Sequence, residues 1–429
     1  MKRLLTAACL FLIAQTALAG VRIEHWTTTG GARVHFVETR VLPIVDVQVD
    51  FAAGSMFDPA GKPGVAALTR GTLDLGAGTL DETAISETMA DIGASLGGGA
   101  DTDRASVAVR TLAEKGKRDT ALDVLTTVLH APRFDPAIFE REKARTVAAL
   151  KEALTRPESI GGRAFWAAMY PSHPYGRQAT PEGLATITRD DLVAHHASYY
   201  TAANATISLV GDLSRADAER IAERIAGGLP KGGAAPLPAP PQPAKGRTEK
   251  IAHPASQAHV FIGMPAIARG DPDFFPLIVG NYTLGGGGFV SRLMKEVRDK
   301  RGFAYSVYSY FSPLRQAGPF QIGLQTKRAQ AGEATKVARD VLDGFLKEGP
   351  SADELAAAKA NLTGSFPLRL DSNKKILDNV ATIGFYGLPL DWLDRYQERV
   401  QAVTVDDVKR AFSRHVRAAD LITVTVAAD

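Results

Sequence analysis

The chain has 429 residues, a formal charge of +3 and 45% hydrophobic residues, values that are ordinary for a soluble globular protein. Its 50 basic and 47 acidic residues are interspersed, so the sequence lacks the basic patch typical of nucleic-acid binding, and we expect no nucleic-acid partner. A chain of this length is too long for one ordinary core and predicts two domains of about 200 residues each.

Residues 1–19 are predicted to be a secretory signal peptide. A basic start and an apolar run precede an Ala-Leu-Ala sequence that ends at Ala19, which is an A-x-A-type cleavage site. The run is too short to span a bilayer, so a membrane anchor is the weaker interpretation. Cleavage also removes Cys9, the one cysteine, which excludes a cysteine nucleophile or a disulfide in the mature chain. We therefore expect a periplasmic or secreted protein without membrane attachment.

The first half of the chain predicts strands and helices in mixed order. Residues 45–51 alternate, with Asp46, Gln48 and Asp50 on one face, which predicts a half-buried strand with one face in water. The segment LGGGAD at 96–101 is interpreted as flexible or closely packed backbone beside a strand. Because no regular βαβ alternation appears, we expect an α+β fold with largely antiparallel sheets. The other expected elements are strands at 104–111 and 205–209 and helices at 82–93, 117–131, 136–154 and 190–200.

A pattern repeats in the two halves of the chain. The segment ITRDDLVAHHASYY parallels VTVDDVKRAFSRHV, and in each a threonine (Thr188, Thr404) precedes an aspartate at the third following position (Asp191, Asp407). A threonine at the N-cap with an acidic residue at N3 is typical of a helix start. Each helix leads at the same spacing into a predicted strand, NATISLVGD or DLITVTVAAD. We interpret the chain as two homologous halves.

A segment dense in proline, glycine and alanine, GGLPKGGAAPLPAPPQPAKGRTEK, separates the halves. Proline fixes φ and removes a backbone donor, so this segment predicts an extended linker and not a helix or central strand. The expected domains are residues 20–227 and 250–429, joined by the linker 228–249. Each is expected to be a largely antiparallel sheet with packed helices, and together they form one half of a clam-shell.

The segment GSMFDPAGKPGVAALTRGTL, residues 54–73, resembles the active-site segment of the pitrilysin-type metallopeptidases. These inverzincins include the mitochondrial processing peptidase and its bacterial relatives. In that family the order Gly-x-Ala-His-x-x-Glu-His places two histidines on one helical face, where they bind zinc. The glutamate between them acts as the general base for a zinc-bound water. Gly64, Val65 and Ala66 match the lead-in to this motif.

The three motif positions that bind zinc or act as the general base carry other residues here. The resemblance places the first histidine at Ala67, the glutamate at Arg70 and the second histidine at Gly71. Alanine and glycine have no donor atom, and arginine stays charged and repels a cation. We therefore expect no metal bound by this chain. The sequence leaves open whether the degenerate site has another use, such as binding of a peptide carboxylate by Arg70.

The third ligand of the family is a glutamate on a later helix. The resemblance places this position near Ala148 or Ala149, with Glu152 close by in FEREKARTVAALKEALTRPES. Without histidine partners, a lone glutamate does not hold zinc.

Three histidines of the first half are candidates for a metal role but favour structural ones. His195 and His196 are adjacent, so they point in different directions on a helix, and His173 precedes a proline. The mature chain also offers no pair of histidines at i and i+4. A self-sufficient zinc peptidase with unusual ligands is therefore the weakest interpretation.

The segment LGGGGFVSRLMKEVRDKRGFAYSVYSYF, residues 284–311, resembles the second domain of the same family. There an arginine and a tyrosine reach the substrate at the zinc site of the facing domain, and the matching positions are Arg298 and Tyr305. Both side chains can donate hydrogen bonds to a peptide carbonyl and stabilise a developing oxyanion. Alternatively, Arg298 is one charge on a solvated face and Tyr305 packs in the core. The glycine run 285–288 lacks the order of a phosphate-binding loop, so no nucleotide site is expected.

Some members of this family work as two chains, of which one binds zinc and the other supplies the arginine and the tyrosine. The resemblance therefore implies a non-catalytic, substrate-binding subunit of an exported heteromeric zinc metallopeptidase. Its implied partners are a homologous zinc-binding subunit, in a heterodimer or a dimer of heterodimers, and an extended peptide substrate. The alternative is a peptide-binding or structural scaffold protein of the same fold with no peptidase partner.

Overall fold

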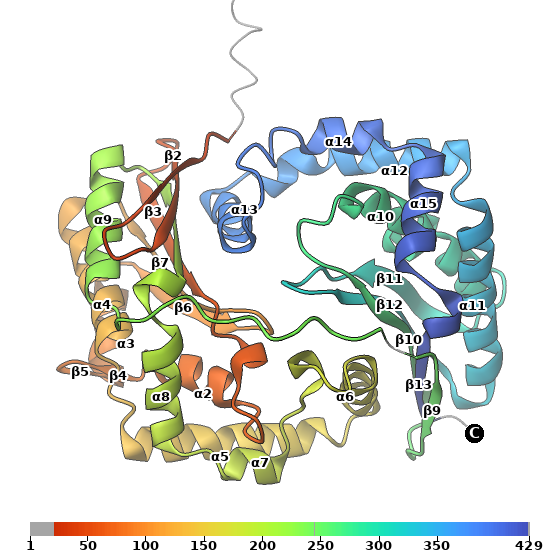
Figure 1. The fold of residues 1–429 in the computed structure, drawn as a ribbon, viewed down its shortest axis with the longest axis horizontal. Helices are drawn as coiled ribbons and strands as arrows, with labels where there is room; N and C mark the ends of the chain where they lie inside the picture. The colour runs from red at the N-terminus through yellow and green to blue at the C-terminus, as the bar shows by residue number, and fades with distance from the viewer. Residues whose placement is uncertain (1–20, 244, 428–429) are drawn as a thin grey trace, which may run out of the picture.

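The computed structural model describes residues 21–243 and 245–427, so the predicted signal peptide lies outside the described residues. The described chain forms two halves that lie side by side, each built around its own sheet (Figure 1). The first sheet has the order β1-β2-β8-β3-β7-β6 and the second the order β11-β12-β10-β13-β9. None of the helices in the described part of the chain combines the length and the apolar content needed to cross a bilayer.

The strands of the first half are β1 (Glu24–Thr27), β2 (Arg33–Glu38), β3 (Ile44–Phe51), β6 (Ser95–Ala100), β7 (Ala105–Leu112) and β8 (Ala205–Gly211), with a small β4–β5 pair at Gly76–Ala77 and Leu80–Asp81. The strands of the second half are β9 (Thr248–Ile251), β10 (Gln257–Ile267), β11 (Ala304–Phe311), β12 (Gly318–Lys327) and β13 (Ile422–Val426). The strands expected at 45–51, 104–111 and 205–209 are confirmed as β3, β7 and β8. Residues 95–100 themselves form the edge strand β6, and of the two interpretations of this segment the close packing beside a strand holds, because a Cβ atom at Gly98 would lie 2.1 Å from the Ser106 carbonyl oxygen on β7.

The helices of the first half are α2 (Val65–Thr72), α3 (Glu82–Asp91), α4 (Lys115–His130), α5 (Pro136–Ala153), α6 (Pro157–Met169), α7 (Pro181–Ala185), α8 (Arg189–Tyr199) and α9 (Arg215–Gly227). Those of the second half are α10 (Phe274–Asn281), α11 (Ala331–Glu348), α12 (Ala352–Gly364), α13 (Asn373–Tyr386), α14 (Tyr396–Ala402) and α15 (Val405–His415). The four helices expected from periodicity are confirmed as α3, α4, α5 and α8. Between α9 and β9 the described residues contain no helix or strand, and β9 begins inside the expected linker range.

The internal repeat is confirmed by the strand pairing. In the first sheet β2 pairs parallel with β8, which is followed by antiparallel β3, β7 and β6. In the second sheet β9 pairs parallel with β13, followed in the same way by antiparallel β10, β12 and β11. The repeated helices α8 and α15 both begin with a capping box, made by Thr188 with Asp191 and by Thr404 with Asp407. The expected α+β class with mainly antiparallel sheets is therefore confirmed.

The two halves exchange one helix each. Helix α6, from the first half, packs on β10 and β13, whereas α13, from the second half, packs on β2, β3 and β8 (Figure 1). Both contacts need a glycine, because a Cβ atom at Gly161 would lie 2.5 Å from the Phe261 ring and one at Gly384 would lie 2.5 Å from His35. Each half therefore completes the other's core, and the Pro-rich segment is not the only connection between them.

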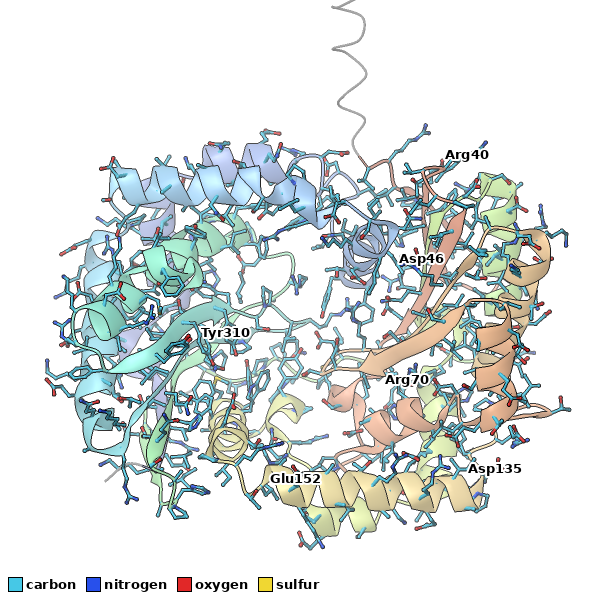
Figure 2. The ribbon with its side chains drawn as sticks, turned by 180° about the vertical axis from the view of Figure 1, so that it is seen from behind. Arg40, Asp46, Arg70, Asp135, Glu152 and Tyr310 are labelled. Carbon is cyan, nitrogen blue, oxygen red and sulfur yellow. The ribbon has the colours of Figure 1, made fainter. Side chains whose placement is uncertain are left out.

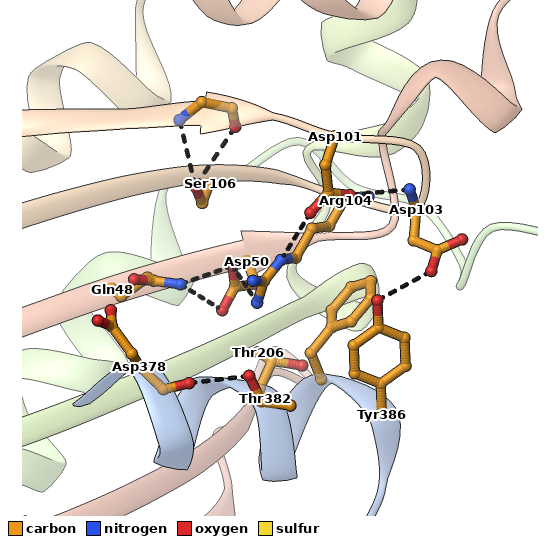
Figure 3. Close-up of polar contacts among 12 residues, drawn as sticks. Gln48, Asp50, Asp101, Asp103, Arg104, Ser106, Thr206, Asp378, Thr382 and Tyr386 are labelled. Carbon is orange, nitrogen blue, oxygen red and sulfur yellow. Dashed lines mark hydrogen bonds and ion pairs between the residues drawn. The ribbon is translucent and has the colours of Figure 1, made fainter. Parts of the chain in front are cut away.

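The exchange changes the environment of β3. The face of β3 that alternation placed in water carries Asp46 and Asp50, and both side chains are buried because α13 covers the sheet. Asp46 accepts two hydrogen bonds from the Arg110 guanidinium, at 2.7 and 3.0 Å. Asp50 accepts hydrogen bonds from Gln48, 2.9 and 3.0 Å away, and lies 3.4 Å from Arg104 (Figure 3). The expectation of a solvated face was wrong because alternation cannot reveal a helix from another half.

Burial of Asp50 predicts a pH-dependent stability. Burial raises the pKa of this carboxyl to about 7, although Arg104 opposes the rise, whereas Asp101 and Asp378 reinforce it. The folded state therefore binds a proton that the unfolded state releases near pH 4, and this stabilising contribution is lost as the pH rises from about 4 to about 7. We expect the free energy of unfolding of the wild type, relative to Asp50→Asn, to fall across this range by a few kcal/mol at about 1.4 kcal/mol per pKa unit.

Urea unfolding of both proteins at closely spaced pH values measures this difference. Asp340→Asn is the matched control, because the Asp340 side chain is exposed on α11, pairs with Lys336 and does not contribute to the raised pKa of Asp50. The control should not reproduce the fall expected for Asp50. A difference between wild type and Asp50→Asn that does not change between pH 4 and pH 7 would contradict the prediction.

A third buried carboxylate, that of Asp103, joins the halves directly. Asp103 lies in the turn between β6 and β7 and is 0% exposed. Its Oδ1 accepts a hydrogen bond from the Tyr175 hydroxyl at 2.7 Å, and its Oδ2 accepts from the Tyr386 hydroxyl at 2.9 Å and from the backbone N–H of Arg315 at 2.8 Å. Tyr386 ends α13 and Arg315 lies between β11 and β12, so one carboxylate from the first half holds two segments of the second. Figure 3 shows the hydrogen bond to Tyr386.

Candidate functional site

Helix α2 begins at a buried carboxylate that lies upstream in the chain. Both oxygens of Asp58 accept hydrogen bonds at 2.7 Å, from the backbone N–H groups of Gly64 and Ala66. Gly64 has φ 115, a left-handed conformation that favours glycine. Burial raises the pKa of Asp58 to about 6 against the effect of these hydrogen bonds. The segment GSMFDPAGKPG is therefore a preformed helix start, which explains why the helix persists without its metal ligands.

The two positions that the resemblance assigns to zinc-binding histidines lie on helix α2. Ala67 and Gly71 are one turn apart on α2, and both are exposed. A Cβ atom at Gly71 would meet no neighbouring atom within 4 Å, so space remains beside the helix where a ligand side chain would stand. Neither residue has a donor atom, so these positions do not fit zinc.

Arg70 turns away from that space and into the protein. Its side chain is 5% exposed, its Nε donates to the Ser106 carbonyl at 2.5 Å and its Nη2 donates to the Gly97 carbonyl at 2.6 Å. Its Nη1 lies 3.3 Å from Asp74, one turn further along α2. Arg70 therefore ties α2 to β6 and β7 (Figure 2). Because the guanidinium donors of Arg70 already bind groups of the protein, Arg70 is not available to bind a peptide carboxylate.

We therefore predict that the Arg70 side chain stabilises the folded state. Arg70→Met should lower the free energy of unfolding by about 2–4 kcal/mol, because two buried carbonyl groups and Asp74 lose their charged donor. Amide hydrogen exchange within residues 95–100 should accelerate, since β6 loses its attachment to α2. Arg70→Lys keeps the charge but not the planar set of guanidinium donors. Its free energy of unfolding should lie between those of the wild type and Arg70→Met. Equal protection of β6 in wild type and Arg70→Met would show that the attachment contributes nothing.

The region of the family's third ligand also lacks a metal site. Ala148 and Ala149 are exposed positions on α5, which packs against α2. The Glu152 side chain is 76% exposed and lies 3.7 Å from Arg156 on the same stretch of chain. The glutamate near the predicted position is therefore an ordinary surface charge.

The three candidate histidines are engaged within the protein. His173 Nε2 lies 2.6 Å from Gln316 Oε1, and its Nδ1 accepts from the Tyr175 backbone N–H. His195 Nε2 lies 3.2 Å from the Ala53 carbonyl, and His196 Nε2 lies 2.9 Å from the Leu129 carbonyl. Burial lowers the pKa of all three rings, that of His195 to about 4. Their roles are structural, as their sequence positions favoured.

Among the described residues, one group of three potential metal ligands occurs, formed by Asp271, Asp273 and His415 in the second half. His415 Nδ1 lies 2.9 Å from the Ala266 carbonyl and its Nε2 lies 3.1 Å from Asp273, which also binds Arg414 at 2.7 Å. Both ring nitrogens lie beside oxygen atoms of the protein, and Asp273 is already paired with the Arg414 guanidinium. This group is an ion-pair cluster at the start of α10.

The glycine run 285–288 allows two segments of the second half to pack closely. It begins in a turn (Tyr282–Gly286) that follows α10 and contacts β11, where a Cβ atom at Gly285 would lie 2.4 Å from the Ser309 hydroxyl. Two hydrogen bonds between Asn281 and Ser309, of 3.0 and 2.7 Å, stabilise this close contact. The glycines therefore bring the following turn, Gly288–Val290, close to β11.

Arg298 and Tyr305, which the sequence singled out, lie together beside this turn. The Arg298 guanidinium carbon lies 5.3 Å from the centre of the Tyr305 ring and 4.7 Å from the centre of the Phe289 ring. Tyr305 is 87% exposed, so it is not the core residue of the alternative interpretation. The nearest carboxylate, that of Asp299, is 3.9 Å from Arg298, and within the described chain the guanidinium makes no hydrogen bond. The guanidinium is thus positioned by contact with two aromatic rings.

Phe289 was missed by the sequence interpretation, which treated the residues around it as a glycine run only. The available signal was an aromatic residue directly after that run and before the helix that carries Arg298. A guanidinium held between aromatic faces keeps its donor edge exposed, because cation–π contacts use the faces of the group.

Comparison with known proteins agrees with this geometry. The model of the insulinase family, peptidase family M16, matches residues 33–181, and that of the peptidase M16 inactive domain matches residues 186–362. A crystal structure described as a peptidase M16 inactive domain from Pseudomonas fluorescens is 38% identical, with a TM-score of 0.91, and the match covers 94% of this chain and 97% of that chain. The chain belongs to the peptidase M16 family. The resemblance to the pitrilysin-type metallopeptidases is confirmed.

Its M16 relatives include proteins named both as peptidases and as non-peptidases. An uncharacterised zinc protease of Streptomyces coelicolor is 32% identical over 260 residues, which are 58% of this chain and 56% of that protein's length. The non-peptidase homologue YmxG of Helicobacter pylori is 26% identical over 395 residues, with 90% of each chain covered. This chain is thus an M16 inactive-domain protein with the fold of the zinc proteases and without their ligand side chains on α2.

Proposed function

We propose that this chain is the non-catalytic, substrate-binding subunit of an exported heteromeric zinc metallopeptidase. The observation that carries the proposal is a contrast between the two halves. In the first half, the ligand positions Ala67 and Gly71 have no donor atoms, and Arg70 serves the fold. In the second half, Arg298 lies beside Tyr305, and its guanidinium donates no hydrogen bond within the described chain. A chain that binds no substrate would not need to keep the donors of Arg298 at this position.

In this proposal Arg298 and Tyr305 act in trans on a peptide bound at the partner's zinc. A guanidinium and a phenol both donate hydrogen bonds, and a peptide carbonyl accepts them. Donors that are fixed before the reaction stabilise the oxygen as negative charge develops on it, because they need not reorganise. The partner is a homologous zinc-binding subunit, and the substrate is an extended peptide. Export to the periplasm or the exterior, after cleavage following Ala19, belongs to the same proposal.

The test is to purify the mature chain and measure its zinc content and its peptidase activity, alone and mixed with the zinc-binding M16 homologue from the same organism. We expect a metal-free, inactive chain that raises the activity of the homologue when the two form a complex. Stoichiometric zinc with activity in the chain alone would overturn the proposal. A complex whose activity equals that of the homologue alone would also count against it.

The second candidate is a scaffold or peptide-binding protein of the same fold with no peptidase partner. The relative named as a non-peptidase homologue favours this possibility, since its name assigns no peptidase activity to it. The scaffold interpretation predicts that the chain pairs with itself or with a protein outside the M16 family. Size measurement of the chain as isolated from its own cells, followed by identification of its bound partners, separates the two candidates.

A further inference from the structure

A pocket of about 670 Å³ lies between the end of α6 and the proline-rich segment that joins the two halves. This segment crosses in front of the molecule from the first half to the second (Figure 1). One wall of the pocket is formed by residues 168–177 and the other by residues 238–243 and 245–247. The pocket is separate from the degenerate motif on α2 and from the arginine–tyrosine pair of the second half, since neither contributes a lining residue.

The proline-rich wall of this pocket is fixed at both ends. Gln316 Nε2, from the second half, donates a hydrogen bond to the Pro238 carbonyl at 2.5 Å. The Arg247 carbonyl accepts a hydrogen bond from the backbone N–H of Thr423 at 2.8 Å, directly before β9. Because proline fixes φ, the chain between these two points has few alternative conformations. The pocket is therefore preformed.

The charged side chains of the pocket are all basic. Arg177, Lys245 and Arg247 line it, and none of the described lining residues is a carboxylate. Arg177 Nη1 donates to the backbone carbonyl of Asp58 at 3.0 Å, a neutral acceptor, and the carboxyl oxygens of Asp58 accept from backbone N–H groups at the start of α2. Arg247 lies 3.6 Å from Glu249 in a pair that is partly exposed to water, and such pairs contribute little. The pocket therefore favours an anion.

Prolines supply an apolar surface beside these charges. Pro238, Pro240 and Pro241 line the pocket, and the His173 ring on the opposite wall is neutral because burial lowers its pKa, an effect that Arg177 reinforces. Extended proline-rich segments pack well against aromatic rings. A ligand that matches both features carries a negative charge at one end and a flat apolar body at the other.

We propose that this pocket binds a small organic anion, namely a carboxylate or phosphate group carried on an aromatic or similarly flat apolar body. Arg177, Lys245 and Arg247 supply the positive charge, and guanidinium groups form strong charge-assisted hydrogen bonds with such oxygens. Helix α6 packs on the second sheet, so a ligand bound between its end and the segment before β9 also holds the joining segment in place. The inference goes beyond the proposed function and is independent of it, since every pocket residue belongs to this chain.

The experiment measures binding of phenyl phosphate to the full mature chain by titration calorimetry, with inorganic phosphate and benzyl alcohol as comparison ligands. We expect phenyl phosphate to bind about tenfold more tightly than either, because it alone uses both the charges and the proline surface. Its affinity should fall as the salt concentration rises. Amide hydrogen exchange should slow within residues 164–178 and 245–251 when phenyl phosphate is bound, which locates the ligand in this pocket.

Arg177→Gln and Arg247→Gln should each weaken the binding of phenyl phosphate about tenfold, as the loss of a hydrogen bond to a charged group predicts. Arg247→Gln is the variant less apt to disturb the fold, because the Arg247 side chain makes only the exposed pair with Glu249. Arg156→Gln is the matched control, since Arg156 makes a similar pair, 3.7 Å from Glu152, and does not line the pocket. Its affinity should equal that of the wild type.

Three results would overturn the proposal. The first is the absence of phenyl phosphate binding, and the second is an equal affinity for benzyl alcohol, which would show that the charges contribute nothing. The third is binding that both glutamine variants leave unchanged, or that slows amide exchange only outside the two pocket segments. None of these results bears on the proposed partner subunit.

Discussion

Replacement of Asp103 by alanine is expected to lower the free energy of unfolding by about 3–5 kcal/mol and to uncouple the two halves. The carboxylate is fully buried and accepts from two hydroxyl groups and one backbone N–H, contributed by Tyr175, Tyr386 and Arg315. Burial, together with the Asp103 charge, raises the pKa of both tyrosines, so they remain donors. Alanine would leave these donors buried with no acceptor at this position, which costs more than a lost surface contact.

The expected result is measured by urea unfolding, followed separately by the fluorescence of tryptophans in each half. Trp26 reports on the first sheet, and Trp392 reports on the cluster around α10. The two signals should coincide in the wild type and separate in Asp103→Ala. Tyr386→Phe is the matched control, since it removes one donor and leaves the carboxylate with two, at a cost of about 1 kcal/mol. Coincident transitions in Asp103→Ala would mean that the exchanged helices alone join the halves.

Replacement of Arg298 by alanine is expected to lower the kcat/KM of the reconstituted complex about 100- to 1,000-fold, the effect of removing one donor from a developing oxyanion. The structural reason is that Arg298 has no hydrogen-bond partner in the described chain, its nearest carboxylate, that of Asp299, is 3.9 Å away, and two aromatic rings contact its guanidinium. Assembly with the zinc-binding subunit should be unchanged. The stability of the chain should change little, because the side chain bridges no two elements by hydrogen bonds.

The matched control for this prediction is Arg301→Ala. Arg301 follows Arg298 by three positions and carries the same charge, but it pairs with Glu296 at 2.8 Å. Its loss should alter kcat/KM less than about threefold, as expected of a surface ion pair. A complex of Arg298→Ala that assembles normally and keeps the rate of the wild type would remove the main support for action in trans.

The sequence by itself determined the features that depend on short stretches of chain. The capping boxes at Thr188 and Thr404 need only residues three positions apart, so the repeat and its two helix starts were visible without the structure. The periodicity of residues 82–154 placed α3, α4 and α5 for the same reason. The loss of ligand atoms at Ala67 and Gly71 is a matter of residue chemistry, and the spacing of Arg298 and Tyr305 identified that pair before their contact was known.

The tertiary structure alone decided what depends on residues far apart in the chain. The exchange of α6 and α13 buries Asp50, which alternation placed in water, because the covering helix comes from the other half of the sequence. The same applies to Arg70, whose partners are carbonyl groups on β6 and β7, and to Phe289, which meets Arg298 only after the glycine turn folds onto β11. Local patterns report the periodicity of one element, whereas burial and hydrogen bonding are set by whichever elements pack against it.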